Sequence, residues 1–315
     1  MPYELAIPEL VRARASSLGD KGLAWLTDLD AIVAALARDW ELALGPVMSG
    51  GSAALVAEAV TEAGLPVVLK VPVPDPAPVR HEAAALQFAG GRGYARLLQH
   101  DPTSGAMLLE RLGTPLHESG LPLDAQLRII CTTLETAWRR PPIEHQFMNG
   151  REKAEDLAAF ITELWQEFDR PCSERVVDRA VMYARRCASA FAPETCVLAH
   201  GDAHALNTMR VPGSQAAEFK FIDPDGLVIE PAYDLAISMR GWNEPLLAGD
   251  AVVLGLQRAR FLSELTGVSP GPIWEWGFIE RVSTAFVFKQ LAHDTEAAQY
   301  LAVSELWAAE NVDSF

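Results

Sequence analysis

The spacing of apolar residues changes from the pattern of strands to the pattern of helices at about residue 113. Before this point, short apolar segments such as ELALGPVM and LPVVLKV are bounded by glycine and proline turns, which predicts strands. After it, apolar residues recur every three to four positions over long stretches, which predicts helices. The 315 residues suffice for two packed units. We therefore expect an α+β protein with a strand-rich part, 1–112, and a helix-rich part, 113–315.

The expected elements follow one another without a repeat or a low-complexity linker. The first part begins with two helices, within 4–40, that are broken at SSLGDKG. A small antiparallel sheet with one helix follows, its strands being expected at 41–48, 54–64, 65–71, 95–101 and 106–112 and its helix at 79–89. The helices of the second part are expected at 123–139, 153–168, 174–191, 245–265, 273–292 and 295–309.

Composition excludes several classes of function. The net charge of -16 disfavours nucleic acid as a partner, because nucleic-acid binding rests on neutralising phosphates. No apolar run reaches the length of a membrane helix, and MPYELAIPEL lacks the features of a signal peptide. The four cysteines show no paired spacing and are interpreted as free thiols. A cytoplasmic protein with no membrane partner is expected.

A cluster of polar residues follows the apolar strand CVLA. It reads HGDAHALN at 200–207 and precedes FKFIDPDG at 219–226. Phosphoryl transfer needs the nucleotide phosphates held, Mg²⁺ ligated and the acceptor hydroxyl oriented by a carboxylate. Asp202 and Asn207 have the spacing of the base and the metal ligand in the protein-kinase catalytic loop, and Asp223 follows one strand later. We expect Asp202 to accept the hydroxyl proton, and Asn207 and Asp223 to hold Mg²⁺.

The residues that would bind ATP come earlier in the chain. Lys70 ends the strand PVVLK, and Glu82 follows on the next helix, so an ion pair that aligns Lys70 on the phosphates is expected. LLERLG at 108–113 would form the hinge, where backbone groups of Glu110 and Leu112 pair with adenine. The turn SGGSA would cover the phosphates, although it is not G-x-G-x-x-G. Its residues expected to bind ATP are Ser49, Gly50, Gly51 and Ser52.

Together these motifs resemble the aminoglycoside phosphotransferase family, a branch of the protein-kinase-like fold. The subgroup of streptomycin 6-kinases and hydroxyurea phosphotransferases shares H-G-D-x-H-x-x-N, I-D-P-x-G and E-P-A-Y-D-L-A with this chain. The resemblance spans about 7–265 and implies a two-lobed fold with extra N-terminal helices. It also implies ATP and Mg²⁺ as cofactors and an aminoglycoside hydroxyl as acceptor, hence an antibiotic-resistance kinase. Relatives commonly carry H-G-D-L-H-x-G-N, where this chain has Ala203 and Leu206.

The acceptor is expected to be a small molecule, but no motif identifies its site. The resemblance gives Asp234 a bracing role with substrate contact as a second possibility, and Trp242 could stack on a sugar. Six acids and one base, Arg240, lie between 223 and 250, and further acids follow 294. These acids are compatible with a cationic acceptor such as streptomycin, whereas solubility is the more usual role of such an excess of acids. The acids expected near the acceptor are Glu305, Glu310 and Asp313.

Four alternatives remain open from the sequence. His200 and His204 are four residues apart and could hold zinc, but a zincin needs H-E-x-x-H on a helix. The acceptor could be hydroxyurea, an amino sugar or another metabolite. A protein kinase is disfavoured by the absence of the H-R-D arginine and of A-P-E. A non-catalytic nucleotide-binding regulator is disfavoured because each residue that the chemistry needs is present.

Overall fold

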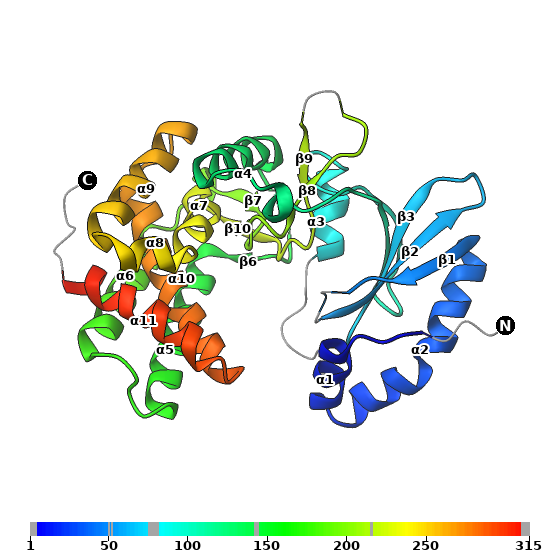
Figure 1. Cartoon of the computed structure of the whole chain (residues 1–315), viewed down its shortest axis with the longest axis horizontal. Coiled ribbons are helices and arrows are strands. Elements are labelled where there is room, and N and C mark those ends of the chain that lie inside the picture. The colour runs from blue at the N-terminus through cyan, green and yellow to red at the C-terminus, as the bar shows by residue number, and fades with distance from the viewer. Residues whose placement is uncertain are drawn as a thin grey trace. The chain divides into compact units, whose positions relative to one another are not determined.

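The computed structural model describes residues 5–49, 51, 53–74, 82–141, 145–214 and 217–309. The chain divides into two compact units, one of Met1–Gly113 with Val211–Ala216 and one of Thr114–Arg210 with Ala217–Phe315. The first contains the larger sheet, and the second is mainly helical (Figure 1). The expected α+β class is confirmed.

A five-stranded antiparallel sheet forms the body of the first unit. Its spatial order is β1-β2-β3-β5-β4, so the chain leaves β3 for a helix before it returns to the sheet edge. The register places Lys70 of β3 beside Val56 on one side and Met107 on the other. The strands are β1 (Leu42–Val47), β2 (Ala54–Thr61), β3 (Pro66–Pro72), β4 (Leu97–Asp101) and β5 (Ala106–Glu110).

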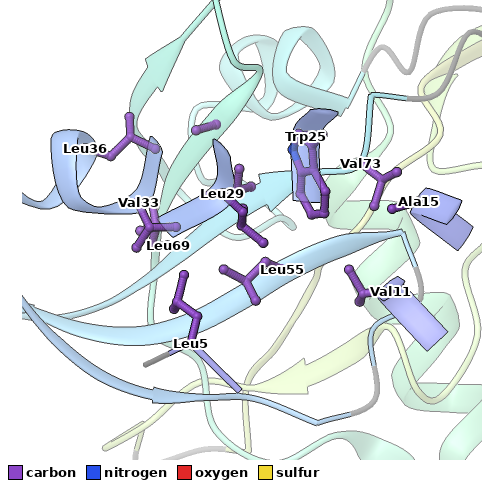
Figure 2. Packing of buried hydrophobic residues seen from close by; sticks show 12 residues of the cluster. Leu5, Val11, Ala15, Trp25, Leu29, Val33, Leu36, Leu55, Leu69 and Val73 are labelled. Atoms are coloured by element: carbon purple, nitrogen blue, oxygen red, sulfur yellow. The ribbon is translucent and has the colours of Figure 1, made fainter. Parts of the chain in front are cut away.

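Two helices, α1 (Glu9–Ser17) and α2 (Asp20–Asp39), pack against one face of this sheet. Leu29 and Val33 of α2 are buried against Leu69 of β3, as Figure 2 shows. Full burial of an aliphatic side chain of this size contributes about 1.5–3 kcal/mol, so the packed face of α2 is a main source of the stability of this unit. The two helices expected within 4–40 are therefore present where the structure describes the chain.

The side chains of β3 alternate between two different environments. Successive side chains of a strand point to opposite faces, so Leu69 and Val71 enter the core beneath α1 and α2 while Lys70 points the other way. On that opposite side Lys70 meets α3 (Glu82–Ala89), the third helix of the unit. One short strand thus supports the core with one face and presents a buried lysine with the other.

The second unit is built around α10 (Pro270–Gln290), which is apolar and buried on most of its circumference. Its Trp274 packs on Trp307 with ring centroids 4.5 Å apart, and its Trp276 meets Tyr233 at 5.0 Å. The other helices are α4 (Leu123–Ala137), α5 (Gly150–Glu167), α6 (Glu174–Ala190), α7 (Pro231–Arg240), α8 (Asn243–Ala248), α9 (Ala251–Thr266) and α11 (Asp294–Ala309), with 3-10 turns η1 (Leu116–Ser119) and η2 (Pro193–Thr195).

Short strands carry the polar cluster of the second unit. A three-stranded sheet has the order β6-β10-β7, and a separate antiparallel pair is formed by β8 and β9. Their bounds are β6 (Met148–Asn149), β7 (Val197–Ala199), β8 (Thr208–Arg210), β9 (Phe219–Phe221) and β10 (Leu227–Ile229). Each of these strands is only two or three residues long.

The expectation of one helix at 245–265 was wrong. The structure breaks it into α8 and α9 at Gly249, which has extended dihedral angles. Asp250 then starts α9, because its carboxylate accepts hydrogen bonds from the backbone N–H groups of Val252 and Val253. Helix α7 was also not expected, although Pro231 at its first position is a usual start signal.

Two expectations from composition concern the whole chain. Within the described ranges no helix is long and apolar enough to cross a membrane. The four cysteines are free, as expected, and Cys131, Cys187 and Cys196 are buried. Burial raises the pKa of Cys131 to about 12 and that of Cys196 to about 11, so these thiols stay protonated at neutral pH.

Candidate active site

The pairing of β8 with β9 brings Asn207 and Asp223 to the same end of this hairpin. Thr208 is paired with Phe221, so the residues just outside the pair, Asn207 and Ile222, lie opposite each other. The backbone N–H of Ile222 donates to the carbonyl of Asn207 at 3.0 Å, which continues the ladder by one step. Asp223 follows immediately. The two side chains expected to hold Mg²⁺ thus leave adjacent chain segments at one end of this hairpin.

His200 fixes the start of the polar loop. It is fully buried, and its Nδ1 accepts a hydrogen bond from the backbone N–H of Asp202 at 3.0 Å. Nε2 therefore carries the proton and donates to the carbonyl of Ile222 at 2.9 Å. The ring also meets the edge of Phe221. His200 thus connects the polar loop to the segment just before Asp223 and anchors the loop.

Asp234 holds the backbone of the same loop. Its carboxylate accepts hydrogen bonds from the N–H groups of His200 and Gly201, at 3.0 and 2.8 Å, and from the indole of Trp138 at 2.9 Å. Asp234 has no exposed surface. The geometry therefore gives it the bracing role, and it corrects the second expectation, that Asp234 contacts the substrate.

Gly201 allows the loop to turn this closely. Its φ of +91° is a conformation that side chains rarely adopt, and an added Cβ would lie 2.8 Å from the Cβ of Asp225. The backbone N–H of Asp225 donates to the carbonyl of His200 at 2.7 Å. The backbone of Asp225 is thereby held against that of His200.

The side chain of Asp202 is held at both carboxylate oxygens. Arg240 donates to Oδ1, and Nε2 of His204 lies 3.2 Å from Oδ2. Nδ1 of His204 accepts from the N–H of Asn207, so the Nε2 proton is the one that faces Asp202. About a third of the Asp202 side chain, 31%, is exposed. The carboxylate is thus fixed in orientation yet accessible.

The charge of Asp202 is set by competing effects. Burial alone would raise the pKa of this carboxyl, but the hydrogen bond from His204 and the positive charge of Arg240 outweigh it. The pKa of Asp202 therefore lies well below its usual range, and the group is ionised at neutral pH. Asp202 and Glu280 in turn raise the pKa of Arg240 in spite of its burial.

Asn207 and Asp223 offer oxygens of the kind that Mg²⁺ prefers. The amide nitrogen of Asn207 donates to the backbone carbonyl of Asp202 at 3.0 Å, which leaves Oδ1 as the atom for a metal. Asp223 is exposed and has a φ of +56°, an unusual conformation for a residue other than glycine. Mg²⁺ usually takes one or two protein ligands together with phosphates and water, and this pair fits that requirement.

A zinc site at His200 and His204 does not fit the structure. Three ring nitrogens of this pair are bonded to protein groups through Asp202, Ile222 and Asn207, and the fourth faces the Asp202 carboxylate. The described residues also contain no group of three or more His, Cys, Asp or Glu side chains placed to hold a metal. The histidines are better explained as hydrogen-bonding residues of the loop.

In the first unit, the expected ion pair between Lys70 and Glu82 is present. Nζ of Lys70 lies 2.6 Å from Oε1 of Glu82, and each side chain is only 7% exposed. A lysine buried to this degree needs a paired carboxylate, because an isolated buried charge is costly. The pair joins β3 to α3 and fixes the direction of the lysine.

The turn and the hinge of the first unit are described only in part. Ser49 is exposed at the end of β1, whereas Gly50 and Ser52 lie outside the described residues. At the hinge, the backbone N–H of Glu110 donates to the carbonyl of Arg96 at 3.0 Å, and the side chain of Glu110 accepts from the N–H of Arg96. That N–H of Glu110 is therefore already used, and Leu112 is buried.

The residues expected near the acceptor lie in different surroundings. Trp242 is half-buried before α8, with the guanidinium of Arg258 above its ring at 5.0 Å. Glu305 instead accepts hydrogen bonds from the backbone N–H and the hydroxyl of Ser173 at 2.6 and 2.7 Å, which caps α6. The expectation of an acceptor contact for Glu305 is thereby replaced by a structural role. Glu310 and Asp313 lie outside the described residues.

The sequence reasoning did not assign a role to Arg240 or to its partner Glu280. Arg240 ends α7 and lies between two carboxylates, with Nη1 3.3 Å from Oε2 of Glu280. One signal was available, because Arg240 is the single base among the six acids between 223 and 250. Nothing in the local pattern marks Glu280, which lies on the largely apolar α10.

Comparison with known proteins gives a consistent result. Residues 40–303 match a family described as aminoglycoside/hydroxyurea antibiotic resistance kinase. A streptomycin 6-kinase of Streptomyces glaucescens is 26% identical over 279 residues, which cover 86% of this chain and 87% of that protein. A hydroxyurea phosphotransferase of Kitasatospora aureofaciens is 30% identical over 288 residues, which cover 85% of this chain and 79% of that protein.

Solved structures show the same fold. An ethanolamine kinase of Plasmodium vivax has a TM-score of 0.62 at 11% identity, with 93% of each chain covered. An aminoglycoside phosphotransferase of Streptomyces rimosus, in complex with ADP and streptomycin, has a TM-score of 0.54 at 18% identity, covering 81% of this chain and 98% of that one. Such neighbours are protein-kinase-like phosphotransferases, so the expected fold is confirmed.

Proposed function

Because the chain belongs to the aminoglycoside/hydroxyurea antibiotic resistance kinase family and is a phosphotransferase that acts on a hydroxyl group, we propose that it phosphorylates a streptomycin-like aminoglycoside with ATP and Mg²⁺. The observation that carries the proposal is the arrangement of Asp202, Asn207 and Asp223 in the second unit. A fixed, ionised carboxylate lies beside an amide, and a second carboxylate leaves the adjacent strand.

Asp202 is proposed to orient the acceptor hydroxyl and to receive its proton. The transition state of phosphoryl transfer is loose in most analyses, so the protein contributes mainly through positioning and electrostatics. Arg240 and His204 fix the plane of the carboxylate, and its exposed part can accept a hydrogen bond from a hydroxyl. Because the carboxylate is ionised at neutral pH, it can accept a hydrogen bond from the acceptor hydroxyl and so orient it.

Asn207 and Asp223 are proposed to hold Mg²⁺ through their oxygens. The metal, when bound, would neutralise charge on the phosphate oxygens. The protein contributes two ligands at one end of the β8–β9 hairpin, and Asn207 keeps its orientation through its hydrogen bond to Asp202. The hydrogen bond from His200 to Ile222 holds the segment that leads to Asp223.

Lys70 is proposed to contact the nucleotide phosphates, with Glu82 setting its direction. The nucleotide is expected to be ATP, and nucleotide use by a structural neighbour is evident from its complex with ADP. Adenine recognition is proposed to use backbone groups of 110–112 other than the Glu110 N–H, which donates to Arg96. The turn at 49–52 is proposed to cover the phosphates.

The proposed acceptor rests on two supports. Two curated relatives, from Streptomyces glaucescens and Streptomyces griseus, are streptomycin 6-kinases. The net charge of -16 would also attract a polycation, whose guanidinium groups suit carboxylates.

A second candidate is a small neutral acceptor such as hydroxyurea. It is favoured by the 30% identity to a hydroxyurea phosphotransferase.

A product screen tests the proposal. The purified protein is incubated with ATP or GTP, Mg²⁺ and one acceptor at a time, and mass spectrometry looks for a phosphorylated product. Streptomycin, hydroxyurea, amino sugars and nucleosides form the panel. We expect a phosphorylated streptomycin that is absent with the Asp202→Asn variant. Phosphorylated hydroxyurea alone would select the second candidate, and tight nucleotide binding without turnover on any acceptor would contradict the proposal.

A further inference from the structure

Helix α7 holds the catalytic loop by its two ends. Near its start, Asp234 binds the backbone N–H groups of His200 and Gly201. At its last residue, the guanidinium of Arg240 binds Oδ1 of Asp202. Three consecutive residues of the loop are thus fixed by one helix, two through their backbone and one through its side chain. Of the two residues of α7, Arg240 is the one that contacts the carboxylate proposed to meet the acceptor.

Arg240 is itself held from behind by α10. Its Nη1 lies 3.3 Å from Oε2 of Glu280, and the other oxygen of Glu280 accepts a hydrogen bond from the hydroxyl of Tyr233 at 2.6 Å. Burial raises the pKa of Tyr233, so this phenol keeps its proton and donates it. The side chain of Glu280 is 6% exposed, that of Arg240 20% and that of Asp202 31%. The three charged groups form a row whose outer end is Asp202.

The end of α7 packs closely on α10 and is hydrogen-bonded to it. An added Cβ at Gly277 would lie 2.6 Å from the Cβ of Met239, which shows how closely the two helices approach. Arg281 donates to the carbonyls of Met239 and Gly241 at 2.6 and 3.3 Å, and these groups lie where a helix lacks internal partners. Burial lowers the pKa of Arg281 to about 9, which leaves it charged at neutral pH.

An arginine suits position 240 better than a lysine for geometric reasons. Its planar guanidinium presents N–H groups in a fixed fork and can contact Glu280 and Asp202 at once, whereas a lysine carries one ammonium group on a flexible stem. If this row served stability alone, its contribution would be doubtful, because buried ion pairs are often no better than apolar replacements. Stability does not require that the row end in a partly exposed carboxylate, that of Asp202.

We propose that Arg240 is a positioning residue for phosphoryl transfer, which anchors Asp202 to Glu280 of α10 and thereby sets the direction of the carboxylate toward the acceptor. The inference rests on the proposed role of Asp202. Arg240 acts through Asp202 and need not touch the acceptor. Because a misplacement of about 1 Å can cost about 10²-fold in rate, loss of this anchor should appear in kcat rather than in nucleotide binding.

The test compares Arg240→Gln, Arg240→Lys and a matched control, Arg186→Gln. Arg186 also pairs with a glutamate of α10, at 2.8 Å from Glu275, but it lies on α6 away from the loop. We expect Arg240→Gln to lower kcat about 10²-fold while the Kd for ATP-Mg²⁺ changes by less than about twofold. Arg240→Lys should recover part of kcat, and Arg186→Gln should leave it within about twofold of the wild type. Wild-type kcat in Arg240→Gln overturns the inference.

A second measurement separates this inference from the proposed function. Crystal structures of the wild type and of Arg240→Gln, grown under the same conditions, show whether Asp202 keeps its rotamer. A turned carboxylate with the Asp234 contacts to His200 and Gly201 intact supports the positioning role, even if streptomycin proves to be the wrong acceptor. An unchanged Asp202 rotamer overturns it. A wild-type protein without any transferase activity refutes the proposed function and leaves this structural comparison to decide.

Discussion

The carboxylate of Asp202 is the residue on which the proposed chemistry depends most. The pKa of Asp202 is lowered in the folded protein, so in an unfolded chain it would bind a proton at higher pH. The stability from its contacts with Arg240 and His204 is therefore fully present above about pH 4 and is lost as the pH falls toward the folded pKa. Between about pH 5 and pH 8 Asp202 stays ionised. A fall of activity in that range must come from another group.

Replacement of Asp202 by asparagine tests its role at nearly constant volume. The variant keeps a hydrogen-bonding side chain but loses the charge that receives the proton, so we expect kcat to fall by about 10²–10⁴-fold. The Kd for nucleotide, measured by calorimetry, should remain nearly unchanged. Asp178→Asn, at an exposed position of α6, serves as the control. Turnover of Asp202→Asn within a few-fold of the wild type would remove Asp202 from the mechanism.

Asp223 should be the carboxylate through which Mg²⁺ strengthens nucleotide binding. We expect Asp223→Ala to abolish the difference between ATP affinity with Mg²⁺ and ATP affinity with EDTA, because a hard cation loses one of its few protein oxygens. Asp225→Ala is the comparison, since Asp225 is also exposed and lies two residues away. If only Asp225→Ala removes the Mg²⁺ dependence, the ligand has been assigned to the wrong carboxylate.

The sequence could predict the local part of this site but not its distant part. Asp202 and Asn207 were found because five residues of one loop fix their separation, and the hydrogen bond between them follows from that spacing. Arg240 reaches Asp202 across 38 residues, and Glu280 reaches Arg240 across another 40. Contacts over such separations depend on how α7 crosses α10, which no local pattern encodes. A lone base among acids was the available hint.

At the scale of elements, the tie between β3 and α3 gives a separate test in the first unit. Removing either Lys70 or Glu82 leaves a buried charge without its partner, which costs about 3–5 kcal/mol when a buried pair is broken. We expect Lys70→Met and Glu82→Leu each to reduce stability and nucleotide affinity, and the double variant to reduce stability by less than the sum. Thermal unfolding and ATP titration measure the two effects. Additive losses would mean that the residues act independently.

Elements were predicted well where the apolar pattern is long and regular. The strands around Lys70 and the helices α4, α5, α6 and α11 each bury a set of apolar residues. These residues recur in the sequence at the spacing of a strand or of a helix. The break between α8 and α9 was missed, because the apolar spacing continues through Gly249 and only the cap of Asp250 interrupts it. Helix α7 was missed because it is buried almost throughout and so lacks a polar face to give it a period.

At the scale of the whole molecule, the fold does not determine whether the negative net charge helps to bind the acceptor. The chain carries 42 acidic and 26 basic residues, yet several acids are committed to structure. Asp234 braces the loop, and Glu305 caps α6 through Ser173. The net charge includes these carboxylates, although their hydrogen bonds within the protein make them less available to a cation. The acids that remain candidates for long-range attraction include Glu310 and Asp313, which lie outside the described residues.

Salt dependence should show whether these charges act on the acceptor. Exposed charges are screened over about 8 Å at physiological ionic strength, so attraction of a polycation weakens as salt is added. We expect the KM for streptomycin to rise between low and high salt, and to be higher at low salt in Glu310→Gln and Asp313→Asn. Glu305→Gln is the matched control, because it should lower the Tm by loss of a helix cap without changing the salt dependence of KM. Steady-state kinetics with hydroxyurea provides the neutral comparison. Equal salt dependence for both acceptors would show that the acidic residues only solvate the surface, and the kinase would then select its acceptor by the shape of its site.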